Sequence, residues 1–211
     1  NLNGLIGADG KRVDDAAEQF ERLLTLLPLE RPLDPGTAAA LVEATIDWID
    51  PDESPLLNGA EDDRYTSRQP AYRPANFWFT STSELLAVEG FTGEIYTALR
   101  PHLSALPPQA NGERWTLNVN TATDLVLASL LPNLGPLDVE PFLNGAYEDQ
   151  ADFREDFPGS EQIPPNVLGT SSRWFLLTVT ATIGTAQSTM YSLLERNGEA
   201  VRARLRTFDA N

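Results

Sequence analysis

The feature that most constrains the fold of this 211-residue chain is a change in its hydrophobic pattern near residue 170. Before that point, apolar residues recur at helical spacing in segments separated by prolines. After it, β-branched and aromatic residues form the short runs that are typical of strands. The charge changes as well: residues 1–169 carry 10 basic and 28 acidic side chains, whereas residues 170–211 carry five arginines and three acids. We therefore expect a helical region followed by a small β-sheet.

Two strong helix signals lie near the N-terminus. The first helix is predicted to begin at the acidic pair Asp14 and Asp15 and to end at Pro28. In the second, Asp34 precedes Pro35, which is the order of an N-cap residue and a proline in the first turn. The positions at helical spacing are Ala16, Phe20, Leu23, Leu24 and Leu27 in the first helix, and Ala38, Leu41, Val42, Thr45 and Trp48 in the second.

Two later helix starts show the spacing of a capping box, in which a Ser or Thr and an acidic residue three positions later satisfy each other's backbone amides. One is Ser81 with Glu84, and the other is Thr121 with Asp124 ahead of residues 125–131. The region that ends at residue 169 is therefore expected to be mostly helical.

The C-terminal segment has the pattern of a three-stranded antiparallel meander. Residues 173–183 are typical of a well-buried strand, and residues 186–196 lead to Asn197-Gly198, the strongest two-residue hairpin signal. Residues 201–206 then alternate strictly, and so small a sheet needs something to cover its apolar face. The alternation predicts one face with Arg202, Arg204 and Arg206 and an opposite face with Val201, Ala203 and Leu205. The arginine face is either solvated or docks an acidic partner.

Composition excludes several kinds of function. The chain has no Cys and one His, so it lacks the ligands for a thiolate zinc site, an iron–sulfur cluster or a disulfide framework. Its net charge of −16 opposes binding to nucleic-acid phosphates. No apolar run reaches the length of a membrane span, and the sequence indicates a soluble chain. Hard cations bound by oxygen ligands remain open.

The densest acidic stretch, residues 47–63, has the ligand spacing of a calcium loop. Counted from Asp50, oxygen side chains fall at positions 1, 3, 5 and 12, which are Asp50, Asp52, Ser54 and Glu61. An EF-hand requires glycine at position 6, where this chain has Pro55. The sequence therefore leaves two interpretations open, a calcium loop of another geometry and a solvated acidic loop.

Other candidate sites are weaker. A second acidic cluster has no regular spacing, and for it a solvated surface is favoured; its members are Glu148, Asp149, Asp152, Glu155 and Asp156. His102 has no Gly-x-Ser-x-Gly nucleophile motif to accompany it. No phosphate-binding loop is present either. We therefore expect no catalytic residues, although a carboxylate-dependent hydrolase remains an alternative.

A nucleic-acid-binding module is the other alternative. Residues 88–96 and 117–123 resemble the pieces of helix-hairpin-helix modules, which grip DNA backbones in other proteins. The negative charge of this half of the chain argues against that use, and we expect no nucleic-acid partner.

Taken in order, a series of short motifs resembles the K-type minor pseudopilin of the bacterial type II (general) secretion system. The set covers most of residues 1–170, and its order along the chain is more specific than any single member. The motifs are residues 1–4, 47–52 and 58–62, Tyr65, Tyr72, Arg73, Asn76, and residues 83–85, 99–103 and 118–122.

The resemblance implies an α+β fold, with a pilin-like antiparallel β-sheet that carries a large inserted α-helical domain related to SAM and helix-hairpin-helix modules. We expect residues 1–12 to start the pilin-like β part and residues 171–211 to form its C-terminal meander. The inserted α-domain is expected at residues 13–170, with subregions of about 13–75 and 76–170. The family's apolar N-terminal helix, a cleaved membrane anchor, is missing from this sequence.

The resemblance also implies a structural subunit at the tip of the periplasmic pseudopilus, needed for its assembly and for protein export. It implies calcium bound by Asp50, Asp52, Glu61 and Asp62; Ser54 is added on spacing alone. The expected partners are the I-type and J-type minor pseudopilins, with a secreted substrate protein as a further candidate. The full-length protein is expected to be anchored in the inner membrane through the missing helix, and no enzymatic activity is implied.

Overall fold

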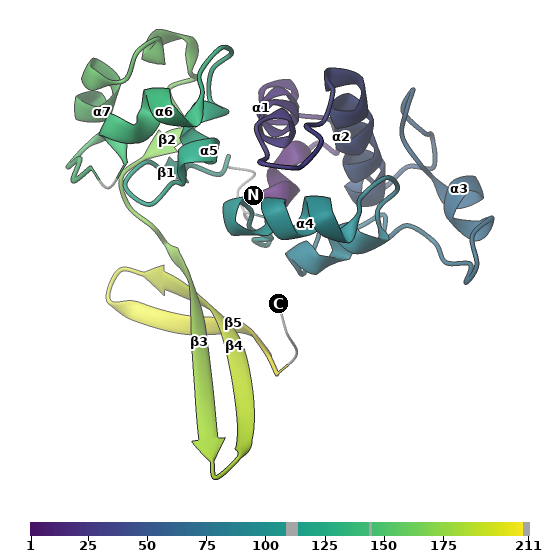
Figure 1. Ribbon diagram of the computed structural model, residues 1–211. Coiled ribbons are helices and arrows are strands. Elements are labelled where there is room, and N and C mark those ends of the chain that lie inside the picture. The colour runs from purple at the N-terminus through teal and green to yellow at the C-terminus, as the bar shows by residue number, and fades with distance from the viewer. Residues whose placement is uncertain (109–113, 144, 209–211) are drawn as a thin grey trace. The chain divides into compact units, whose positions relative to one another are not determined.

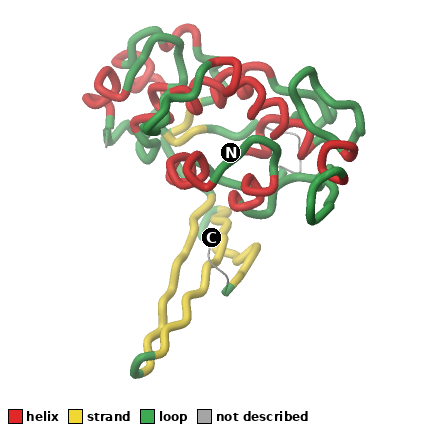
Figure 2. Tube along the Cα trace, turned by 45° about the vertical axis from the view of Figure 1, so that its right-hand side comes forward, coloured by secondary structure: helices red, strands yellow, loops and turns green. Residues whose placement is uncertain are grey.

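The computed structural model describes residues 1–108, 114–143 and 145–208, and the chain divides into two compact units. Asn1–Thr170 forms a helical unit and Ser171–Asn211 forms a unit built on three strands, as Figures 1 and 2 show. The predicted α+β class is confirmed. Among the described residues, no helix has the length and apolar character needed to cross a membrane.

The two long helices begin where the local signals place them. α1 (Asp14–Thr25) has Asp14 and Asp15 in its first turn and Arg22 in its last, charges that suit the helix dipole at each end. α2 (Pro35–Ile49) begins after Asp34, whose side chain accepts a hydrogen bond from the Thr37 amide at 3.1 Å. The two helices pack against each other.

The rest of the helical unit consists of short elements. Its 3₁₀ helices are η1 (Leu2–Leu5), η2 (Thr82–Ala87), η3 (Arg100–His102), η4 (Glu140–Phe142) and η5 (Ser160–Gln162). Its other α-helices are α3 (Asp62–Thr66), α4 (Gly93–Leu99), α5 (Asp124–Ala128), α6 (Pro136–Val139) and α7 (Gln150–Asp156). A two-stranded parallel sheet joins β1 (Leu117–Asn118) to β2 (Leu168–Gly169), and the sequence pattern did not indicate it.

Of the two predicted capping boxes, one is confirmed and one is wrong. Ser81 and Glu84 form a capping box, at the start of the short helix η2. The prediction for Thr121 is wrong, because α5 begins after Thr123. The Asp124 carboxylate accepts from the next residue's amide, Leu125 N, at 2.8 Å and does not reach back to Thr121.

Buried side chains of the helical unit form two clusters. The larger joins α1 and α2 to η2 and α4, so that Leu24, Phe79 and Leu99 belong to one core. The smaller lies among α5, α7 and the β1–β2 pair, with Phe153 and Phe157 stacked at 4.8 Å. The buried clusters therefore do not divide near residue 75, the expected boundary between subregions.

Residues 1–12, expected to start the β part, lie in the helical unit. Leu2 and Leu5 are buried in its larger core. The Asn3 side chain is buried and donates to the carbonyls of Phe79 and Leu106, both at 2.9 Å. Strand-like pairing in this segment is limited to an isolated bridge between Ile6 and Arg12.

The C-terminal unit is the predicted antiparallel meander, in the order β3–β4–β5. Its strands are β3 (Trp174–Ile183), β4 (Ala186–Asn197) and β5 (Ala200–Thr207). The turns contain Gly184 and Gly198, with φ of 62° and 59°, a left-handed conformation that glycine adopts without a steric penalty.

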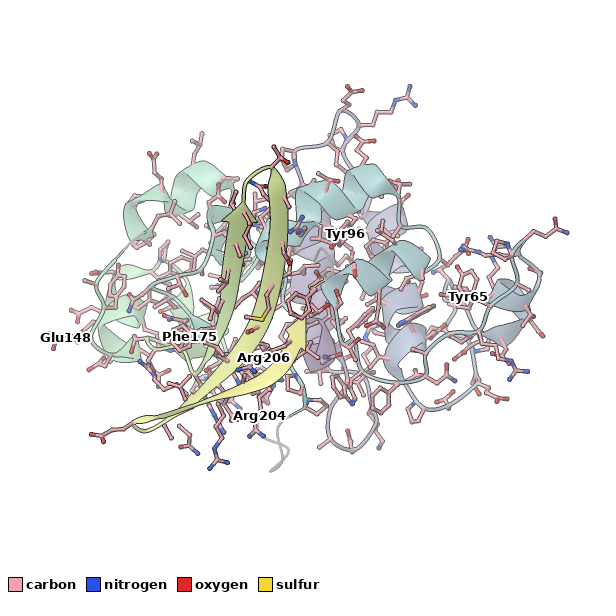
Figure 3. All side chains as sticks on the ribbon, turned by 90° about the horizontal axis from the view of Figure 1, so that it is seen from below. Tyr65, Tyr96, Glu148, Phe175, Arg204 and Arg206 are labelled. Carbon is pink, nitrogen blue, oxygen red and sulfur yellow. The ribbon has the colours of Figure 1, made fainter. Side chains whose placement is uncertain are left out.

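Two sequence predictions for this sheet are wrong. β3 is not a buried strand in this chain, since nine of its ten residues are exposed. The arginines do not share one face, because a register shift at Leu193/Leu194 changes the alternation of β5. Arg206 lies opposite Ser192 and Arg202 lies opposite Glu195, which are on different faces of β4. Figure 3 labels Arg204 and Arg206 on this sheet.

Candidate metal centre

Three of the predicted calcium ligands come together at the end of α2. Asp50 follows the last residue of that helix, Asp52 lies in the loop after it, and Glu61 precedes the first residue of α3. One carboxylate oxygen from each of the three lies within 4.8 Å of the other two. The loop thus brings together oxygens that are separated by up to eleven positions in the sequence.

The donor set fits a hard divalent cation. Oxygens that share one calcium ion lie 2.3–2.6 Å from it, so they can be at most about 5 Å apart, and this condition is met. Asp50 Oδ1 and both carboxylate oxygens of Glu61 are buried and have no hydrogen-bond partner among the described residues. Buried anionic oxygens are costly without a compensating charge, which a cation would provide.

Burial and mutual repulsion perturb these carboxylates. Desolvation raises the pKa of Asp50 to about 6, and the neighbouring Asp52 charge adds to the effect. Desolvation likewise raises the pKa of Glu61 to about 7, with further contributions from Asp47, Asp50, Asp52 and Asp62. Both side chains are buried by area, with residue exposures of 8% and 5%. Without a cation, Glu61 is therefore partly protonated near neutral pH, whereas Asp50 takes up its proton only near pH 6.

An aromatic cluster holds the two ends of the loop together. Trp48 in α2 and Tyr65 in α3 meet edge to face, with ring centroids 5.4 Å apart. Tyr72 contacts both rings, at 6.4 and 5.3 Å. Tyr65, labelled in Figure 3, is fully buried. Such packing fixes the distance between Asp50 and Glu61, since each directly adjoins one of the two helices.

The other two predicted ligands are placed differently. Ser54 is exposed, and its backbone amide donates to Asp52 Oδ1 at 2.8 Å. The Asp62 carboxylate lies 3.1 Å from the Arg73 guanidinium. The structure therefore brings Asp50, Asp52 and Glu61 together and gives Ser54 and Asp62 other contacts.

Asp47 and Asn76 also lie at the site, although the sequence pattern did not indicate them as site residues. Asp47 is fully buried, desolvation raises its pKa to about 7, and the amide of Leu56 donates to its carboxylate. Asn76 donates from Nδ2 to the Asp52 carbonyl at 3.0 Å, and its Oδ1 is buried without a described partner. The only available signal was that Asp47 belongs to the acidic run and that Asn76 belongs to the ordered motif set.

The remaining candidates do not form comparable sites. Within residues 1–108, 114–143 and 145–208, the second acidic cluster provides no group of three close carboxylates. Its Asp149 instead caps α7, accepting from the amides of Ala151 and Asp152. His102 Nδ1 is hydrogen-bonded to Thr123 Oγ1 at 2.7 Å, and burial lowers the pKa of the imidazole.

Comparisons with known proteins point to one family. Residues 1–108 match the family model described as Type II secretion system (T2SS), protein K. The Type II secretion system protein K of Pseudomonas aeruginosa is 32% identical over 202 residues, 93% of this chain and 57% of that protein. Its counterpart from Pectobacterium carotovorum subsp. carotovorum is 31% identical over 184 residues, 78% of this chain and 52% of that protein. The chain spans a little over half the length of these relatives.

A solved structure shares the fold across the whole chain. It is a chain from the crystal structure of the GspK-GspI-GspJ complex of the enterotoxigenic Escherichia coli type 2 secretion system. The TM-score is 0.82 at 24% identity, and the match covers 100% of this chain and 76% of that one. Since the family model also matches more than half of the sequence, the chain belongs to the type II secretion system protein K family.

Proposed function

We propose that this chain is the greater part of a minor pseudopilin, a structural subunit at the tip of the type II secretion pseudopilus that is needed for pseudopilus assembly and export. The observation that carries the proposal is the similarity over the whole chain to a protein solved in complex with GspI and GspJ. By this analogy, its partners are the I-type and J-type minor pseudopilins. The protein would work in the periplasm, anchored in the inner membrane, without catalysis.

Exposed apolar side chains on the β3–β5 sheet support an assembly role. Leu176 is 58% exposed, and Phe175, labelled in Figure 3, and Leu205 are exposed as well. Three strands with uncovered apolar side chains are marginally stable in water. Further sheet, a helix or a partner subunit would cover them in the assembled protein.

Co-purification tests this role directly. We expect the full-length protein to retain both the I-type and J-type partners when the three are co-expressed, because apolar surface on the sheet becomes buried in the assembly. Replacing Leu176 by Asp should release at least one partner. The matched change Leu137→Asp, at an 83% exposed leucine in α6, should release neither.

Circular dichroism would confirm that both variants are folded. Failure of the wild-type protein to retain either partner would overturn the tip role. Retention of both partners by Leu176→Asp would instead leave the tip role standing and remove the sheet from the interface.

We also propose that calcium binds Asp50, Asp52 and Glu61 and stabilises the helical unit. The buried carboxylate oxygens without partners and their mutual distances support this. The ion would neutralise charges that otherwise repel each other, and its binding to the folded state alone would add stability by mass action. Asn76 Oδ1 is an additional candidate donor, because its amide group already contacts the Asp52 backbone.

Anomalous scattering from a crystal grown with calcium would locate the ion. We expect a peak between the three carboxylates, whereas a peak elsewhere, or none, would contradict the site.

A further inference from the structure

Asp47 is a buried carboxylate beside the calcium loop, and it is not one of the proposed calcium ligands. It lies in the last turn of α2, and none of its surface is exposed. The backbone amide of Leu56 donates to its two oxygens, at 3.2 Å and 3.3 Å. This contact crosses nine positions of sequence and ties the middle of the loop to the helix that ends just before Asp50.

Gly59 packs directly against the same carboxylate. A Cβ atom at residue 59 would lie 1.9 Å from Asp47 Oδ2 and 2.7 Å from Asp47 Cγ. The φ of Gly59 is outside the left-handed region, so other residues could adopt its backbone conformation. Glycine is therefore required at residue 59 because the Asp47 carboxylate occupies the space that a side chain would need.

Gly59 and Ala60 immediately precede Glu61. A shift of the chain at residue 59 would move the Glu61 carboxylate relative to Asp50 and Asp52. Asp47 is also short and held in a packed helix, so it cannot move aside at little cost.

We propose that Asp47 and Gly59 form a latch that positions the loop, so that Asp47 acts as a positioning residue for Glu61 and not as a calcium ligand. This inference rests on the proposed calcium site. The latch acts by geometry: the carboxylate accepts from the loop backbone, and the missing side chain at residue 59 lets the loop lie against it. Supporting contacts of this kind typically change metal affinity 10- to 100-fold.

A double-mutant cycle with calcium titration calorimetry tests the latch. Gly59→Ala should weaken calcium binding about tenfold in the wild-type background, because the new methyl group clashes with the Asp47 carboxylate and shifts the loop that carries Glu61. In an Asp47→Ala background, the same change should weaken binding less than about twofold, since the obstructing carboxylate is gone. Gly93→Ala is the matched control, because its Cβ would meet nothing within 4 Å.

A conservative variant separates positioning from charge. Asp47→Asn keeps an acceptor for the Leu56 amide but loses the negative charge, so it should bind calcium more tightly than Asp47→Ala. Hydrogen exchange should show the Leu56 amide protected in wild type and Asp47→Asn and unprotected in Asp47→Ala. Equal affinities of the two Asp47 variants would show that only the charge matters and would overturn the latch.

The outcomes distinguish this inference from the calcium proposal. A wild-type protein that binds no calcium would overturn the calcium site itself. A wild-type protein that binds calcium, with equal effects of Gly59→Ala in both backgrounds, would overturn the latch alone.

Discussion

Replacing Glu61 by Gln should weaken calcium binding by about 100-fold or more, equivalent to about 2.7 kcal/mol. Glu61 provides two buried oxygens without other partners, and it closes the loop opposite Asp50 and Asp52. Glutamine keeps the size of the side chain but removes the charge on which calcium affinity depends. Calorimetric titration of the metal-free protein measures the change.

Calcium should also determine which of the two proteins is the more stable, wild type in excess calcium and Glu61→Gln in a chelator. At a calcium concentration 100 times the wild-type dissociation constant, the free energy of unfolding of the wild-type protein increases by about 2.7 kcal/mol. That of Glu61→Gln increases little. For a chain of this size, the wild-type increase raises the melting temperature by about 5–10 °C. In a chelator the order should reverse, because the variant no longer buries a third acidic group near Asp50 and Asp52.

Glu53→Gln is the matched control, since Glu53 is exposed in the same loop. It should bind calcium with nearly wild-type affinity and melt at the wild-type temperature. An equal loss of affinity in both variants would mean that the loop attracts calcium only through its overall charge. An unchanged wild-type melt with and without calcium would remove the stabilising role.

Local signals predicted the elements whose ends are fixed by neighbouring residues. The Asp34-Pro35 pair and the Asn197-Gly198 turn each determine a boundary within a few residues, and the structure has both boundaries at those places. Prediction failed where two similar signals compete, because Thr121 and Thr123 both precede Asp124 and only the second adjoins the helix. It failed again on the arginine face, where alternation in the sequence cannot reveal a register shift in β4–β5 pairing.

The candidate site was predicted in part for a similar reason. Regular spacing led to Asp50, Asp52 and Glu61, because alternate residues of a loop and a late Glu can reach one ion. Spacing cannot reveal that Arg73, in a distant segment, pairs with Asp62, or that Asp47 faces Gly59. Those contacts depend on how α2, the loop and α3 fold back on one another, which the Trp48–Tyr65 packing determines.

Metal-free protein should lose several kcal/mol of stability as the pH rises from 5 to 7.5. Burial raises the pKa of Asp47 and Glu61 to about 7 and that of Asp50 to about 6. In the unfolded chain these groups titrate near pH 4, so across this range the folded state holds protons that the unfolded state has released. Stability therefore decreases with pH until the folded groups are ionised as well. Urea unfolding in the presence of a chelator at several pH values measures this change in the free energy of unfolding.

Comparing wild type with a variant cancels the contributions of other titrating groups to the pH dependence of stability. The lowered pKa of His102 acts in the opposite direction below about pH 6.5, and it is the same in wild type and in the double variant Asp50→Asn/Glu61→Gln. The pairs of Glu89 with Arg64 and Arg68 lower the pKa of that carboxyl, so its contribution is already complete above pH 5. The double variant keeps Asp47, whose pKa burial also raises, so it should lose less than half as much stability as wild type between pH 5 and 7.5. At pH 7.5 without calcium it should be the more stable protein. Parallel pH profiles would mean that Asp50 and Glu61 are solvated and ionised in the folded chain, and a loop of solvated acids has no need of a cation.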